Sequence, residues 1–209
     1  MTISVTYNSA AGAITVNDVL TEWATGFKTA GHGTGNTGGF NTGGRVMSGE
    51  QYATHGSNGS EYAFIAGSDA AKGLNYEFNP KLSAGDNMNH FLWGSLDNVQ
   101  LGTDLGGGQG SNFTLEDYTV SYTGLDLSAA SDAGRAGNAV QDVIYGLMKG
   151  DVSGLEGVLN NLLSGFGLST DSTFDQLAAA GLAHADAPLA ADISLVGVQE
   201  VAQDWALAA

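Results

Sequence analysis

The spacing of apolar residues changes its period along this chain, and that change limits the folds open to it more than any other feature. The segment at 3–8, ISVTYN, alternates apolar and polar residues as a half-buried strand does. Residues 16–27 switch to helical spacing, the middle of the chain returns to strand-like runs, and helical spacing resumes from about residue 133. Strands followed by helices predict an α+β fold, with helices packed on one face of a mostly antiparallel sheet.

Turn residues separate the strand-like runs, and capping residues precede the helical ones. Turn clusters separate the strand-like runs SGEQYATHG, EYAFIAGSD, GLNYEF, HFLWGSLDNVQLGT and YTVSYTGLDL, which predicts antiparallel hairpins. Asn17 is the expected N-cap of the first helix. Thr173 and Gln176 form a capping-box pattern before an Ala-rich helix that would include His184. Two further helices are expected at 138–150 and 155–166, the second with Phe166 on its apolar face.

The charge balance excludes two classes of partner. The chain of 209 residues has 22 acidic and 6 basic side chains, a formal net charge of -16. Such a surface repels phosphate backbones and anionic lipids, so neither nucleic acid nor a membrane surface is expected as a partner.

Cysteine is absent, which excludes disulfides, thiol catalysis and Cys-based metal sites. The N-terminal residues MTISVTYNSAAG lack the basic and apolar regions of a secretory signal peptide.

Two glycine-rich segments interrupt the pattern. Residues 28–45 form a long Gly/Thr/Asn-rich loop with a single histidine, His32, and loops of this length inside a domain are usually functional or disordered. Residues 107–115, GGQGSNFTL, resemble one copy of the calcium-binding β-roll repeat, with Asn112 where Asp is expected. Such repeats need neighbours to form a core, so a loop between two strands is the plainer interpretation.

Catalytic motifs are missing. The sequence contains no Walker loop, nucleophile elbow or HExxH, and the spacing of its many acids singles out no catalytic pair. The chain is therefore not expected to be an enzyme. A hydrolase with an unmarked carboxylate pair is the alternative with least support.

A tyrosine and a histidine end two neighbouring strand-like runs, on either side of the polar loop 79–89. Taken alone, Tyr76 and His90 favour a cross-strand packing pair over a functional one. Their chemistry also suits a metal site, because an imidazole that accepts the proton of a phenol makes phenolate available. Phenolate is a hard oxygen ligand that suits ferric iron, including haem iron. His32, from the glycine-rich loop, could supply a second ligand, whereas His55 and His184 look incidental.

These residues lie within a series of segments that resembles the HasA haemophores, secreted bacterial proteins that scavenge haem. The series includes SVTYNS, EWATGF, NTGGFN, SGEQYA, AFIAGSD, LNY, HFLWGSLD, VIYGLMKGD, STFDQLAAAG and VGVQEVAQDWALAA. Its order and spacing cover nearly the whole chain. The resemblance implies an α+β fold with a curved, mostly antiparallel sheet backed by helices and haem held between two loops.

The resemblance also implies roles for individual residues. Tyr76 and His32 would ligate the iron, and His90 would support Tyr76. Candidate porphyrin contacts are Phe78, Val46, Phe40, Val143, Tyr145, Met148 and Gln141, with core packing the plainer explanation for Val143. Three departures from the family pattern stand out: a shorter His32 loop, a longer and more polar loop at 79–89, and Gln141 where some relatives have histidine.

The implied function is that of an extracellular carrier of haem b. The carrier would take haem from host haemoproteins and deliver it to an outer-membrane TonB-dependent receptor. Residues 1–190 would form a single haem-binding domain, and residues 191–209 the signal for a type I exporter, processed or disordered outside the cell. A monomer is expected, with a domain-swapped dimer as the other state. The alternative from a different class is a type I-secreted adhesion or structural protein, which would fold with calcium and bind no haem.

Overall fold

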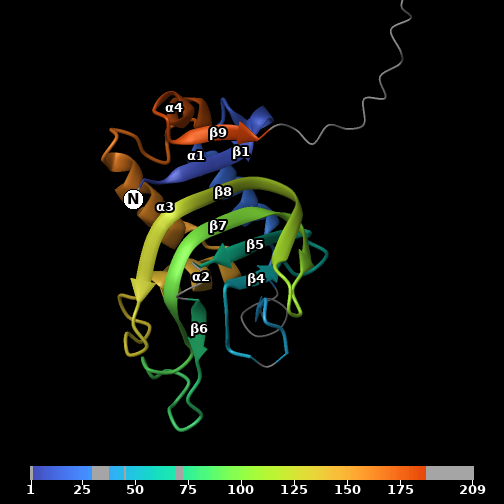
Figure 1. Ribbon diagram of the computed structural model, residues 1–209, viewed down its shortest axis with the longest axis vertical. Helices are drawn as coiled ribbons and strands as arrows, with labels where there is room; N and C mark the ends of the chain where they lie inside the picture. Colours follow the sequence, from blue (N-terminus) through green and yellow to red (C-terminus); the bar gives the residue numbers. More distant parts are fainter. Residues whose placement is uncertain (1, 30–37, 45, 69–72, 187–209) are drawn as a thin grey trace, which may run out of the picture.

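The architecture is that of a computed structural model, which describes residues 2–29, 38–44, 46–68 and 73–186. One sheet runs through all nine strands, and one path through it follows the order β2-β4-β5-β7-β8-β1-β9. Strand β3 pairs with β6, and β6 pairs in turn with β7 (Figure 1). The strands are β1 Ser4–Asn8, β2 Gly39–Phe40, β3 Ser48–Gly49, β4 Gln51–His55, β5 Tyr62–Gly67, β6 Leu74–Glu77, β7 Phe91–Gly107, β8 Phe113–Ala129 and β9 Ala183–Asp186.

The long hairpin of β7 and β8 gives the sheet its curvature. Each of these strands has 17 residues, and the register between them shifts at Leu96/Asn98 and Leu101/Gly102. Such irregularities bend a strand and increase its twist, and Figure 1 shows the two strands arching together across the molecule. All strand pairs are antiparallel except β1 with β9, which confirms the expected mostly antiparallel sheet.

One edge of β7 is shared by two strands placed end to end. Strand β5 pairs with Asn98–Thr103, whereas β6 pairs with the first four residues, Phe91–Gly94. The entry of β6 depends on a glycine, because a Cβ at Gly94 would collide with the carbonyl oxygen of Gly73. Because β6 pairs with only the start of β7, Tyr76 lies away from the centre of the sheet.

The helices pack against one face of the sheet, as expected. They are the 3-10 turn Ser9–Ala11 and the helices α1 Val16–Gly26, α2 Ala139–Met148, α3 Ser153–Ser164 and α4 Phe174–Ala179. Trp23 of α1 is 2% exposed, stacks on Phe27 and donates its indole N–H to the carbonyl of Ala63 in β5, 3.0 Å away. Burial of such apolar side chains is the main term that holds the helices to the sheet.

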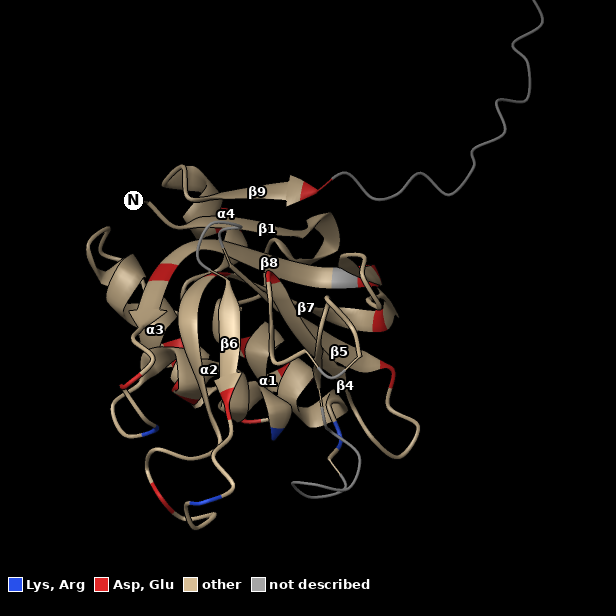
Figure 2. Ribbon diagram, turned by 60° about the horizontal axis from the view of Figure 1, so that its bottom comes forward, with Lys and Arg blue, Asp and Glu red and all other residues tan. Residues whose placement is uncertain are grey.

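Among the described residues, none of the buried side chains is charged, and Figure 2 shows acidic positions distributed over many elements among few basic ones. No helix in the described part of the chain is both long and apolar enough to cross a membrane.

Three local predictions were wrong. The N-cap of α1 is Thr15, whose hydroxyl accepts the Asp18 N–H, because the chain enters the helix two residues before Asn17. His184 lies in β9 rather than a helix, and its Nε2 is 3.0 Å from Thr6 Oγ1 on β1. Phe166 is 48% exposed, because α3 ends at Ser164 and the helical face does not reach it. The capping box at Thr173 and Gln176 is confirmed.

The segment GGQGSNFTL contains the loop between β7 and β8, as the plainer interpretation predicted. It is tied to the segment after β2, since Gly110 donates to the Asn41 carbonyl at 2.7 Å. The Asn41 amide donates to Asn112 Oδ1 at 3.3 Å, and Gln51 Oε1 accepts the Phe113 N–H at 2.6 Å. Asn112 therefore bonds to the segment after β2.

Candidate functional site

Tyr76 and His90 meet at the far end of the β6–β7 pair. Tyr76 lies opposite Leu92 in the register, and His90 directly precedes β7. His90 has a φ of 58°, in the left-handed region that few residues with a Cβ adopt. This conformation costs about 1 kcal/mol or more. The strained residue is the one that bonds to Tyr76, so the hydrogen bond between the two side chains offsets part of this cost.

The two side chains share a short hydrogen bond. Tyr76 Oη lies 2.6 Å from His90 Nδ1, so the phenol can donate to the imidazole when that nitrogen is unprotonated. Burial raises the pKa of Tyr76, and the positive charge of Arg135 acts in the opposite direction more weakly. The phenol is therefore neutral at neutral pH in the free protein. The geometry supplies an oxygen ligand whose proton has an acceptor already in place.

The loop 79–89 between these residues is ordered by one buried side chain. Asn89 is 1% exposed, and its Oδ1 accepts the Asn79 N–H at 2.9 Å. Its amide donates to the carbonyls of Leu82 at 3.3 Å and Ser83 at 3.1 Å. The loop thus closes on itself just before His90, so its length does not loosen the approach of His90 to the phenol.

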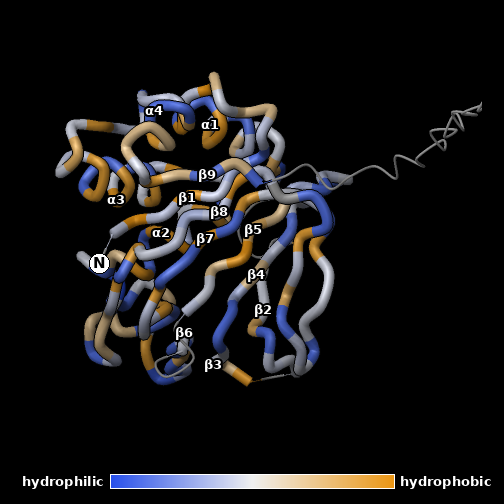
Figure 3. The backbone as a smooth tube through the Cα atoms, turned by 45° about the horizontal axis from the view of Figure 1, so that its top comes forward, coloured by the Kyte–Doolittle hydropathy of each residue, from blue (hydrophilic) through white to orange (hydrophobic). Residues whose placement is uncertain are grey.

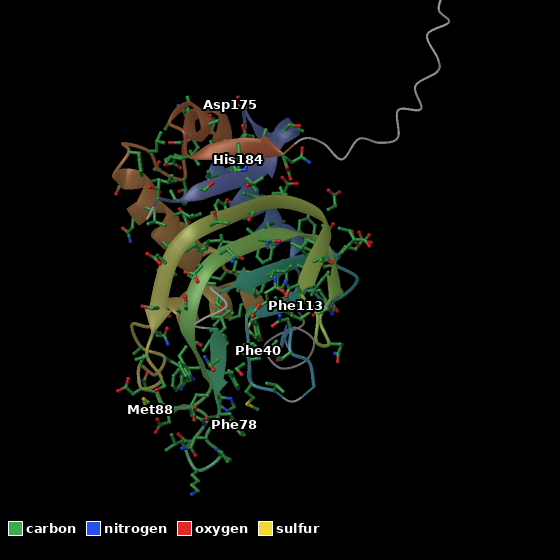
Figure 4. The ribbon with its side chains drawn as sticks, in the orientation of Figure 1. Phe40, Phe78, Met88, Phe113, Asp175 and His184 are labelled. Atoms are coloured by element: carbon green, nitrogen blue, oxygen red, sulfur yellow. The ribbon has the colours of Figure 1, made fainter. Side chains whose placement is uncertain are left out.

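Exposed apolar side chains surround the pair. Phe78 is 44% exposed, and its ring centroid lies 4.8 Å from that of His90. Val46 and Met47 are 52% and 49% exposed, and the Met47 carbonyl accepts the Tyr76 N–H at 2.8 Å. Figure 3 shows this apolar segment beside β3, and Figure 4 shows Phe78 and Met88 at the same end of the molecule, opposite Asp175 and His184. Large side chains left open together in this way are typical of a binding surface.

A second tyrosine stands behind the site. Tyr52 on β4 is 7% exposed, packs edge-on against Phe40 at 5.2 Å and donates to Met148 Sδ at 3.4 Å. Burial raises the pKa of Tyr52 far above its ordinary value, and the nearby Tyr76 adds to the rise. Phe40 and Met148 are therefore joined through Tyr52, which no pattern in the sequence singled out.

The other predicted contacts lie on α2 or behind it. Val143 is 1% exposed in the core, which agrees with core packing. Gln141 is 5% exposed, and its Oε1 accepts the N–H of Leu92, the residue opposite Tyr76, at 2.7 Å. Tyr145 lies beneath the Lys149 ammonium, 4.5 Å from its ring centroid, beside a small pocket between α2 and α3. The predicted porphyrin contacts of Tyr145 and Val143 stay predictions.

Asn138 is a supporting residue that sequence reasoning missed. Its amide donates to the carbonyls of Leu92 at 2.9 Å and Gly134 at 2.8 Å, and its Oδ1 accepts the Gln141 N–H at 3.0 Å. It thereby caps α2 and, with Gln141, fixes the strand residue opposite Tyr76. An Asn before a helical run is a cap signal, but its bonds to Leu92 have no signature in the sequence.

His32 lies outside the described residues, so its predicted role stays a prediction. In the described part of the chain, His, Asp and Glu nowhere gather in groups of three that could hold a metal ion. A pocket of about 610 Å³ lies next to β6, with polar walls that include Asn41, Glu50, Asn75 and Asn112. These walls suit a porphyrin less well than the apolar side chains around Tyr76, because haem has a large apolar face.

Comparison with known proteins decides the family. Residues 1–209 match the family described as Heme-binding protein A (HasA). This chain belongs to the HasA family. It is 39% identical over 194 residues to the hemophore HasA of Serratia marcescens, which covers 90% of this chain and 97% of that protein.

Solved structures of HasA proteins share this fold. The holo hemophore HasA of Yersinia pestis is 26% identical, with a TM-score of 0.69 over 89% of this chain and 99% of that one. A mutant HasA monomer from Yersinia pseudotuberculosis is also 26% identical, with a TM-score of 0.70 over the same shares. The α+β HasA fold expected from the sequence is confirmed.

Proposed function

We propose that this chain is a haem carrier that binds ferric haem through Tyr76, with His32 as the second ligand. The observation that carries the proposal is the 2.6 Å bond between Tyr76 Oη and His90 Nδ1 beside exposed Val46, Met47 and Phe78. A phenol whose proton has an acceptor can ligate ferric iron as phenolate, and the apolar side chains can pack against the porphyrin face. Membership of the HasA family supports the same assignment.

The chain's own residues would bind and release this cargo without transforming it. His90 would take the Tyr76 proton as the oxygen turns to iron, and the ordered loop 79–89 would keep the imidazole in place. The Phe78 ring, against His90, would exclude water from the phenolate on one side. Nothing in these roles requires a bond to be made or broken in the porphyrin, in keeping with a carrier rather than an enzyme.

The wider assignment follows from the family. The carrier is proposed to act outside the cell, to bind haem b taken from host haemoproteins, and to deliver it to an outer-membrane TonB-dependent receptor. Residues 191–209 are proposed as the address read by a type I exporter. The working state is proposed to be a monomer of one haem-binding domain at 1–190, with a domain-swapped dimer as the other form.

A titration with haemin tests the proposal. Adding haemin to the purified protein should give a saturable Soret band with an end point of one haemin per chain. A titration without a saturable band would contradict the carrier assignment. Folding that is unchanged by added calcium, followed by circular dichroism, would separate the carrier from the adhesion alternative.

The pH dependence of binding tests the role of His90. In the free protein the raised pKa of Tyr76 keeps the phenol protonated. If neutral His90 retains that proton on binding, no proton is released and the affinity is flat with pH. Where no side chain takes the Tyr76 proton, binding must release it to solvent, so the affinity falls with falling pH.

We therefore expect haemin binding by the unaltered protein to depend on pH less steeply than binding by a variant that cannot take the proton, which should lose about tenfold per pH unit. His90→Gln can accept the hydrogen bond but not the proton, so its affinity for haemin should fall with falling pH across the whole range. The measurement is the haemin dissociation constant of both proteins from about pH 8 to about pH 5. Parallel curves for the two proteins would show that His90 is not the acceptor.

A further inference from the structure

Arg135 lies beside the candidate site, where hydrogen bonds to the loop before His90 hold it in place. The Arg135 N–H donates to the carbonyl of Asn87 at 3.0 Å and to its Oδ1, also at 3.0 Å. The same Oδ1 accepts the Ala136 N–H at 2.8 Å. The Arg135 guanidinium donates to the carbonyl of Asp86 at 2.5 Å. The segment before α2 and the loop 79–89 therefore form one wall, three residues from His90.

The backbone on either side of Arg135 is also held in place. Gly134 has a φ of 68°, and the Asn87 side chain occupies the space that a Cβ there would need. The Gly134 carbonyl accepts the amide of Asn138, which is 3% exposed and caps α2. Arg135 is thus held between a buried cap and an ordered loop, which lowers the entropy that its side chain would lose on binding a ligand.

Among the described residues, no carboxylate neutralises the charge of Arg135. Its guanidinium bonds to a backbone carbonyl, and the described residues place no carboxylate in an ion pair with it. This is unusual in a chain with 22 acidic and 6 basic residues. The charge also acts on Tyr76, since it lowers the pKa of that phenol against the effect of burial. Figure 2 shows basic positions on the two neighbouring loops at this end of the molecule.

We propose that Arg135 binds a carboxylate of the ligand held at Tyr76, so that the site selects porphyrins with free carboxylate groups. The inference rests on the proposed function and names the ligand group that this wall recognises. A guanidinium has five N–H donors and pairs with a carboxylate through two parallel bonds, and within the described residues the Asp86 carbonyl engages only part of the Arg135 head group. A net charge of -16 opposes an anionic ligand, so a local cation is needed where its carboxylates arrive.

The test compares two iron porphyrins that differ only in their carboxylates, haemin and haemin dimethyl ester, in the same mixed solvent. Arg135→Met should weaken binding of haemin by about tenfold, the loss expected for one charge-assisted hydrogen bond. Its affinity for the dimethyl ester should fall clearly less than its affinity for haemin, because the ester loses only the effect of the Arg135 charge on the Tyr76 phenol. Arg135→Lys should fall between them for haemin, because a lysine keeps the charge but not the paired geometry.

Two control variants separate the contact between Arg135 and the carboxylate from effects of net charge and of the wall's structure. Lys149→Met removes a cation at the end of α2 and should leave both affinities unchanged, which isolates the effect of net charge. Asn87→Ala loosens the wall that holds Arg135 without removing the charge, so it should weaken haemin less than Arg135→Met does and affect the ester little. An Arg135→Met protein that loses equal affinity for haemin and its ester, or none for either, would overturn the inference. Failure of the unaltered protein to bind either porphyrin would instead contradict the proposed function.

Discussion

Tyr76→Phe should lower the affinity for haemin by more than about 100-fold, beyond the 10- to 100-fold typical of losing an outer partner of a metal ligand. The substitution keeps the ring and removes only the oxygen proposed to bind iron. The side chain is only partly buried, and its hydroxyl bonds to His90 at the rim of the fold rather than in its core. The fold should therefore survive, and the loss can be assigned to the ligand. Absorbance titration with haemin measures it, together with a shift of the Soret band.

Tyr62→Phe is the matched control for this experiment. Tyr62 lies on β5, where its ring packs against Gly26 of α1, away from the β6–β7 pair. Its substitution removes the same atom and should leave haemin binding within about twofold of the unaltered protein. A second variant, Tyr76→Phe with His32→Ala, removes both proposed ligands. If this double variant bound haemin with an unchanged affinity and spectrum, the site assignment would be wrong.

Asn138→Ala should destabilise the protein by about 3 kcal/mol and lower its Tm by roughly 10 °C. The loss of the helix cap accounts for about 1 kcal/mol. The remainder comes from the buried carbonyls of Leu92 and Gly134, each of which loses its amide donor. An unsatisfied buried carbonyl costs about 1 kcal/mol or more. Urea unfolding, followed by circular dichroism, measures the change in the free energy of unfolding.

Asn161→Ala provides the comparison on a solvent-facing helix position. Asn161 is exposed on α3, so its substitution should change the free energy of unfolding by less than about 0.5 kcal/mol. A loss in Asn138→Ala no larger than that of Asn161→Ala would show that the three Asn138 bonds contribute little. Leu92 lies opposite Tyr76, so the variant should also bind haemin more weakly at a temperature where it remains folded.

Much of this protein could be predicted from local patterns. The alternation in β1, the helical face of α1 and the capping box of α4 depend on residues within a few positions of one another, and all three are confirmed. The pairing of Tyr76 with His90 was also open to prediction, because a single loop joins their strands. The wrong assignment of His184 has the opposite cause. Its strand is stabilised by pairing with β1, about 178 residues away in sequence.

The sequence by itself determined the α+β class, the HasA resemblance and the two residues of the hydrogen-bonded pair. Hydrophobic period, caps and turns are local, and a chain encodes them directly. Only the tertiary structure decided that loop 79–89 closes on Asn89, that Asn138 holds the strand opposite Tyr76, and that Arg135 joins the wall beside His90. The Arg135 and Asn138 contacts link residues 48 and 46 positions apart, where backbone groups find partners that no local pattern specifies.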